Sequence, residues 1–237
     1  MLPSEFELDP RSLDNHSFGE SWCDLPEGSV VQIPGDGGAR QAFLPCHYEP
    51  GYQYPLVVWM QSAAGDDLVR WMPEISDRNF IGVSANGPRG MRVLFGQSPW
   101  PQERTNFPAA LSAIDSAIDA AAAEFSIHPD RIFIAGAADA AALALTAGLI
   151  HPRRFAGVIA VDPGPAPLMS LLREFRRLQG RRAFVATQSL RPTRSLEELV
   201  DLLVTAGVDV ARFATADVAR ELNGWLLTTA CGAAVVR

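Results

Sequence analysis

The stretch that decides the fold is Arg131-Ile132-Phe133-Ile134-Ala135-Gly136-Ala137-Ala138-Asp139-Ala140, which runs directly into an alanine- and leucine-rich segment at 141–150. Its first half is β-branched or aromatic, a composition that suits a packed, pleated strand. Gly136 follows these apolar residues and indicates a turn. The alanines and leucines after it have high helix propensity and meet no breaker before Gly148 and Pro152. This order predicts a buried strand, a sharp turn and a helix.

The bulk composition limits the classes of protein to which the chain can belong. A length of 237 residues fits one large domain or two small ones, and 48% hydrophobic residues are enough to bury a substantial core. A net charge of -7 argues against general nucleic-acid binding. All 20 basic residues are arginines, so chemistry that needs a lysine is excluded. The arginines that gather between 151 and 194 are interpreted as a solvated face, with an anion-binding face as the alternative.

The cysteines and the N-terminus predict a protein of a reducing compartment. Cys23, Cys46 and Cys231 are too far apart for a metal site or a disulfide framework, so we expect free thiols. The N-terminal residues lack the basic-then-apolar pattern of a signal peptide. No apolar run is long enough to span a membrane. We therefore expect a cytoplasmic protein with no cofactor and no bound metal.

The rest of the chain alternates between apolar runs and amphipathic segments. Residues 1–28 predict an irregular N-terminal arm, and 29–237 predict a single domain. Runs at 29–34 and 40–45 flank a glycine-rich turn, which indicates an N-terminal hairpin. Further strands are predicted at 55–60, 79–85, 155–161, 182–186 and 209–213, and further helices at 68–76, 108–125, 168–179, 195–205 and 217–229. Such alternation with short connections predicts a mostly parallel sheet flanked by helices.

Three stretches resemble the α/β-hydrolase superfamily, and within it the phospholipase/carboxylesterase group and related esterases. Residues 54–60 are similar to the strand before the family's oxyanion loop, and 125–136 are similar to the run into its nucleophile elbow. Residues 151–158 resemble the segment after the elbow helix. The resemblance implies an α/β-hydrolase-like fold, with a mostly parallel central sheet, flanking helices and an N-terminal hairpin. It also implies a G-x-S-x-G elbow, whose serine position is Ala138 here.

The positions at which the resemblance implies catalytic groups hold other residues. Ala138 has no lone pair with which to attack a carbonyl, and the last elbow glycine is replaced by Ala140. The family's His-Gly in the oxyanion loop falls on Gln61-Ser62. The acid falls on Leu190, and the stretch 213–217, where the family's histidine follows the last strand, contains no histidine. No catalytic residue is therefore assigned.

The four histidines of the chain offer no substitute base. His128 precedes the elbow strand and His151 follows the elbow helix, so both are expected at the amino-terminal edge of a parallel sheet. The elbow lies at the carboxyl edge, one strand length away, and a general base must be within hydrogen-bond reach. His16 and His47 lie outside the strand–helix alternation.

Five aspartates are predicted in loops at the carboxyl edge: Asp66, Asp67, Asp139, Asp162 and Asp217. Carboxylates can bind a hard metal ion. Short acidic residues before helices are, however, typical N-caps, and we favour capping over metal binding.

The sequence thus predicts a catalytically inactive α/β-hydrolase-like protein, a pseudo-esterase that acts in binding or as a subunit of an assembly. Its ligand would be a protein partner or a small apolar molecule. The vestigial pocket is predicted from Gln61, Ser62, Ala138, Asp139, Ser189 and Leu190. The alternative is a carboxylic ester hydrolase with a non-standard active site, based on carboxylates and a metal. A third interpretation is a structural subunit whose arm docks on partners. The sequence names neither the partner nor the oligomeric state.

Overall fold

The computed structural model describes residues 28–36, 38–88, 98–100, 107–151, 154–164, 173, 175–189 and 192–232. The predicted arm therefore lies outside the described residues, except for Gly28. Within the described part, eight strands form one sheet in the order β1-β2-β4-β3-β5-β6-β7-β8. The fold class expected from the sequence is confirmed.

The first two strands form the predicted hairpin. β1 (Ser29–Ile33) pairs antiparallel with β2 (Arg40–Leu44), and Gly38 N–H closes the turn on the Gly35 carbonyl at 3.1 Å. β2 in turn pairs antiparallel with β4 (Ile81–Ala85). The hairpin thus extends one side of the sheet.

All remaining neighbours in the sheet are parallel. These strands are β3 (Tyr54–Met60), β5 (Ile127–Ala137), β6 (Gly157–Val161), β7 (Arg182–Thr187) and β8 (Asp209–Ala214). Because they are parallel, the loops after them meet at one edge, where ligands bind in such folds.

β5 is longer than the sequence predicts. Its polar start, which contains His128 and Pro129, has the composition of a turn. In the structure Ile127 pairs with Tyr54, and a register shift separates this pair from the regular ladder that begins at Leu56 and Ile132. Pairing with β3 therefore draws a turn-like segment into the strand.

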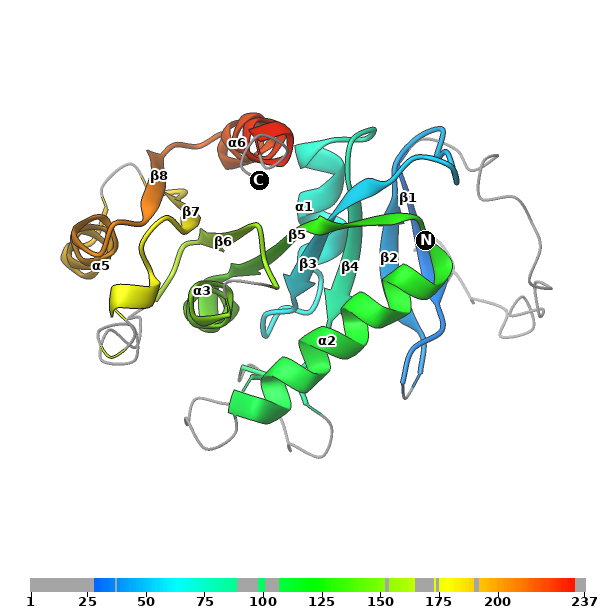
Figure 1. Ribbon diagram of the computed structural model, residues 1–237, viewed down its shortest axis with the longest axis horizontal. Coiled ribbons are helices and arrows are strands. Elements are labelled where there is room, and N and C mark those ends of the chain that lie inside the picture. The colour runs from blue at the N-terminus through cyan, green and yellow to red at the C-terminus, as the bar shows by residue number, and fades with distance from the viewer. Residues whose placement is uncertain are drawn as a thin grey trace, which may run out of the picture.

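Helices cover both faces of the sheet (Figure 1). α1 (Asp67–Ile75) and α6 (Val218–Gly232) pack on one face, and α2 (Phe107–Glu124), α3 (Ala141–Ile150) and α5 (Arg194–Thr205) pack on the other. These five helices confirm the predicted ones within a few residues. Of the helix predicted at 168–179, only the short 3-10 helix η4 (Phe175–Arg177) is assigned, because 168–172 and 174 lie outside the described residues.

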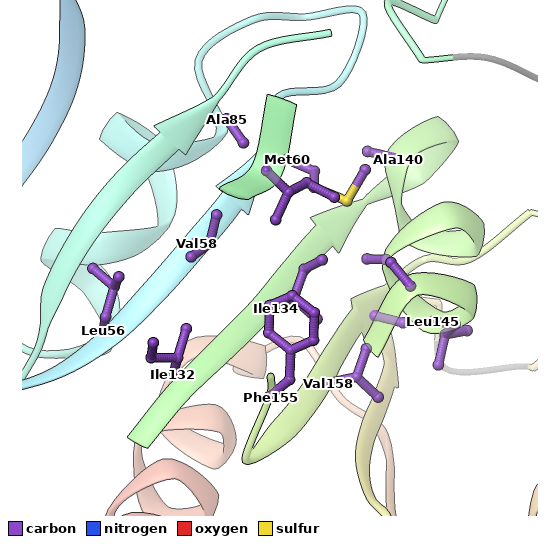
Figure 2. Packing of buried hydrophobic residues seen from close by; sticks show 14 of the residues in the cluster. Leu56, Val58, Met60, Ala85, Ile132, Ile134, Ala140, Leu145, Phe155 and Val158 are labelled. Atoms are coloured by element: carbon purple, nitrogen blue, oxygen red, sulfur yellow. The ribbon is translucent and has the colours of Figure 1, made fainter. Parts of the chain in front are cut away.

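Successive side chains along each central strand point to opposite faces of the sheet, where they pack in two separate cores. Val58 and Ile134 belong to the core on the side of α2, α3 and α5, and in Figure 2 Ile134 lies between Val58 of β3 and Leu145 of α3. Trp59 and Phe133, their neighbours in the chain, face α1 and α6 on the opposite side. Burying each such aliphatic or aromatic side chain stabilises the fold by about 1.5–3 kcal/mol. Strands buried on both faces explain the continuous apolar runs in the sequence.

Among the described residues, no helix has both the length and the apolar character that a bilayer crossing requires. Cys46 and Cys231 are free thiols, and Cys23 lies outside the described residues.

Candidate functional site at the carboxyl edge of the sheet

The turn after β5 has the backbone geometry of a nucleophile elbow. Ala137 is extended, with φ -118° and ψ 153°, and Ala138 then adopts φ +48°. α3 begins three residues later, with Ala141 at φ -63° and ψ -39°. A left-handed conformation costs an L-residue about 1–2 kcal/mol, so the surrounding structure must impose it on Ala138. The side chain at this apex is exposed, and it is a methyl group.

Gly136 makes this turn possible. A Cβ atom at Gly136 would lie 2.7 Å from the carbonyl oxygen of Ala140, closer than real Cβ contacts allow. The backbone of the returning chain occupies that space. The first glycine of the elbow therefore has a steric reason to be present, although the serine is not.

The loop between β3 and α1, at 61–66, is held by the buried carboxylate of Asp67, the first residue of α1. Oδ2 of Asp67, a residue only 4% exposed, accepts a hydrogen bond from the Ser62 N–H. The Asp67 N–H donates to Oε1 of Gln61 at 2.9 Å, and Trp100 Nε1 donates to the Gln61 carbonyl at 2.7 Å. Burial raises the pKa of the Asp67 carboxyl, hydrogen bonds from Ser62 lower it, and the charge of Asp139 raises it further.

Asp139 ties the elbow to the same loop. Its Oδ1 accepts the Ala63 N–H at 3.2 Å, and its Oδ2 is buried with no hydrogen-bond partner among the described residues. In a hydrolase with such an elbow, the oxyanion hole uses two backbone N–H groups. One belongs to the residue after the nucleophile, and the other belongs to the loop that corresponds to the one after β3. The N–H groups of Ser62 and Ala63 in this loop already donate to carboxylates.

A further carboxylate lies directly beside the apex. Ala137 pairs with Val161 across β5 and β6, so the next residues, Ala138 and Asp162, are neighbours at the carboxyl edge. Asp162 also has a positive φ, +47°. Two residues that follow adjacent strands thus share the same unusual backbone conformation.

Asp162 is held in place by the end of β7. Its Oδ1 accepts the Thr187 hydroxyl at 2.7 Å and the Gln188 N–H at 3.0 Å. The sequence predicts Asp162 in an edge loop but does not predict it in the pocket. The available signal was an aspartate directly after a fully apolar strand. Its neighbours, however, come from a strand more than 20 residues away.

The described residues of the predicted pocket all lie at this edge, but they do not form one cluster. Gln61 and Ser62 are buried, and their loop reaches the half-buried Asp139 through the Ala63 N–H because β3 and β5 are neighbours. Ser189 is exposed after β7, which is two strands from β5, or about 10 Å at the usual strand spacing. Asp162 stands between them. Leu190 lies outside the described residues.

The three described histidines lie at the opposite edge of the sheet. His47 follows β2, which runs antiparallel to its neighbour β4, and His128 stands at the start of β5. His151 ends α3 and stacks on Phe107, with ring centroids 6.1 Å apart. It borders a cleft of about 490 Å³ together with Asp115, Asp119 and Arg154. None of these three imidazoles can serve a group at Ala138, and His16 lies outside the described residues.

The prediction that the edge aspartates are helix N-caps is correct only for Asp217, whose Oδ1 accepts the Arg220 N–H at 3.2 Å. Asp66 precedes α1 without a side-chain cap. Asp67 and Asp139 bind loop amides instead, because neighbouring loops bring those amides within reach. Among the described residues, no group of three or more histidine, cysteine, aspartate or glutamate side chains could hold a metal ion.

Two arginines of the arginine-rich segment at 151–194 make hydrogen bonds within the protein. Arg181 Nε donates to the Arg177 carbonyl at 3.4 Å, and Arg182 donates to the Thr229 carbonyl at 3.3 Å. Burial lowers the pKa of Arg181. These two arginines therefore fasten η4 and α6 to the body of the protein.

Comparison with known proteins identifies the fold. No family model and no curated protein sequence matches the chain. A ferulic acid esterase from Anaeromyces mucronatus is 12% identical with a TM-score of 0.66, and the match covers 95% of this chain and 97% of that one. An S-formylglutathione hydrolase from Staphylococcus aureus is 8% identical with a TM-score of 0.62, over 86% and 99% of the chains. A protein from Thermus thermophilus is 16% identical with a TM-score of 0.62, over 90% and 100%.

These matches agree with the mostly parallel sheet and its flanking helices. The chain has the α/β-hydrolase fold, as the sequence resemblance implied. At such low identity the likeness concerns the fold, and function must be argued from the site.

Proposed function

We propose that the protein is a catalytically inactive α/β-hydrolase-fold protein, a pseudo-esterase that acts by binding. The observation that carries the proposal is Ala138 at the apex of a retained elbow, with φ +48°. In a hydrolase this strained turn presents a nucleophilic hydroxyl to the substrate. Here the same turn presents a methyl group, which can form no acyl intermediate.

The electrostatics of the edge support the proposal. Acyl transfer develops negative charge on the carbonyl oxygen, and an oxyanion hole stabilises it with unoccupied N–H donors. In this chain the Ser62 and Ala63 amides donate to Asp67 and Asp139. An incoming oxyanion would have to displace a carboxylate from each donor and would meet its negative charge. The carboxylates bound to this loop would thus repel the negative charge that develops on the carbonyl oxygen in ester hydrolysis.

Among the described residues, no suitable base lies near the apex, and this gives further support. Asp162 is the nearest neighbour of Ala138 across the sheet, but its Oδ1 already accepts two hydrogen bonds. A carboxylate is also a weaker base for a serine hydroxyl than the imidazole that serine hydrolases use. A serine restored at position 138 would therefore remain unactivated.

The test is an esterase assay with p-nitrophenyl acetate, butyrate and octanoate, on the native chain and on Ala138→Ser. We expect both proteins to release p-nitrophenol no faster than a heat-denatured control. Turnover by the native chain would refute the proposal and favour the alternative, a carboxylic ester hydrolase with a non-standard site. In that case, loss of turnover with a chelator or in Asp139→Ala would identify a carboxylate–metal mechanism.

Binding can serve a small ligand or a protein partner, and both remain part of the proposal. A structural subunit that docks through residues 1–28 is the third candidate, and deleting residues 1–25 would abolish its association. A cytoplasmic location is also proposed, with support from the free thiols of Cys46 and Cys231.

A further inference from the structure

A second cleft lies on the face of the sheet that α1 and α6 cover. Its volume is about 270 Å³, and it opens at the carboxyl edge next to the loops after β7 and β8. The side chains that matter for binding are Arg70, Trp71 and Glu74 of α1, Gln188 after β7, and Asp217 and Val218 at the start of α6. None of them belongs to the elbow or to the pocket predicted from the sequence.

Trp71 gives this cleft a rigid apolar wall. The side chain is 5% exposed, and its ring stacks on the fully buried Trp59, with centroids 5.8 Å apart and planes 6° apart. Trp59 occupies one face of the indole, which leaves the other face to Arg70, whose guanidinium carbon is 5.3 Å from the ring centroid. The Trp71 Nε1–H is buried and has no acceptor among the described residues, so the indole contributes an apolar wall and not an accessible donor.

The cleft carries charges of both signs. Arg70 and Glu74 stand one helical turn apart, and neither makes an ion pair with any described residue. Asp217 faces them from the start of α6. Its Oδ1 caps the helix, while its Oδ2 is 3.9 Å from Nε of the exposed Arg220. One guanidinium and two carboxylates thus border the same small space.

From this arrangement we propose that the cleft binds a small zwitterion of the α-amino acid class. The ligand carboxylate lies on the Arg70 guanidinium, which presents a fork of N–H donors. The ligand ammonium lies between the Glu74 and Asp217 carboxylates. A neutral ester would leave these charged groups unmatched, and an acid without an amine would meet an excess of negative charge. Binding here does not depend on whether the elbow is catalytically inactive.

Calorimetric titration of the full-length protein tests the proposal, using the 20 standard L-amino acids one at a time. We expect at least one to bind with a Kd below 1 mM, at a stoichiometry of one. Its amide, which lacks the carboxylate, and its N-acetyl derivative, which lacks the ammonium, should each bind about 10-fold more weakly or worse, because each loses a charge-assisted interaction.

Variants assign the binding to the cleft. Arg70→Gln and Asp217→Asn should each raise the Kd for the amino acid by about 10-fold or more. Arg78→Gln is the matched control, because Arg78 is exposed just beyond α1 and does not border the cleft; it should leave the Kd unchanged. Arg70 and Asp217 are exposed, so replacing either one leaves the core intact and the variant should stay folded.

Three results would overturn the proposal: no binding by any of the 20 amino acids, equal affinity for the N-acetyl derivative, or full affinity in Arg70→Gln. None of these results bears on esterase inactivity, which the hydrolysis assay measures separately.

Discussion

The left-handed backbone at Ala138 predicts that glycine is the better residue at the apex of the elbow. The conformation costs alanine about 1–2 kcal/mol relative to a residue without Cβ. The greater chain entropy of glycine in the unfolded state offsets about 0.5–1 kcal/mol of that gain. Because the Ala138 side chain is exposed, its removal leaves no cavity. Ala138→Gly should therefore raise the free energy of unfolding by about 0.5–1 kcal/mol.

Urea denaturation followed by circular dichroism measures this change, with Ala142→Gly as the matched control. Ala142 is half-buried in the first turn of α3, where glycine costs about 1 kcal/mol relative to alanine. The same substitution four residues apart should thus have opposite signs. For a domain of this size, the melting temperature should rise by about 1–4 °C in Ala138→Gly and fall in the control. If Ala138→Gly destabilises the protein as much as the control does, the elbow is not strained and the reasoning fails.

Two further substitutions test the elbow and its loop. Gly136→Ala should lower the free energy of unfolding by about 2 kcal/mol or more, measured in urea, because the new Cβ would meet the Ala140 carbonyl at 2.7 Å; an unchanged midpoint would show that the turn is loose. Asp67→Asn keeps an acceptor for the Ser62 N–H and removes a buried charge. Since burial raises the folded-state pKa of Asp67, its stabilising contribution is complete at low pH and is lost as the pH rises above the ordinary value of 3.8. Asp67→Asn should therefore gain stability over the native chain as the pH rises from about 4. Asp67→Ala, which leaves that N–H unpaired, should lose about 1–3 kcal/mol. A stability difference between Asp67→Asn and the native chain that does not vary with pH would contradict the assigned pKa direction.

The fold could be predicted because its signals are local. The composition of the apolar run at 55–60 predicts a buried strand, and that of the alanine-rich segment at 141–150 predicts a helix. The alternation of such strands and helices along the chain predicts a parallel sheet. The start of β5 could not be predicted, because pairing with Tyr54 rather than local propensity makes it a strand.

The site was predictable only in part. The alanine at position 138 and the sheet edge at which the loops meet were readable from the order of residues. The bonding of the aspartates was not: the sequence indicates caps, whereas Asp67 and Asp139 bind amides of the loop after β3. A carboxylate takes the nearest available donor, and which donor is nearest depends on the packing of β3 against β5.

The sequence by itself determined the order of strands and helices and the absence of a hydroxyl at the elbow. These follow from side-chain periodicity and from residue identity, which are properties of the chain before it folds. Only the tertiary structure decided that Ala138 is held at a positive φ and that Asp162 stands beside it. It alone brought Arg70, Trp71 and Asp217 around one cleft. These relations join residues from different strands and helices, and the distances between those residues are set only when the strands and helices pack together.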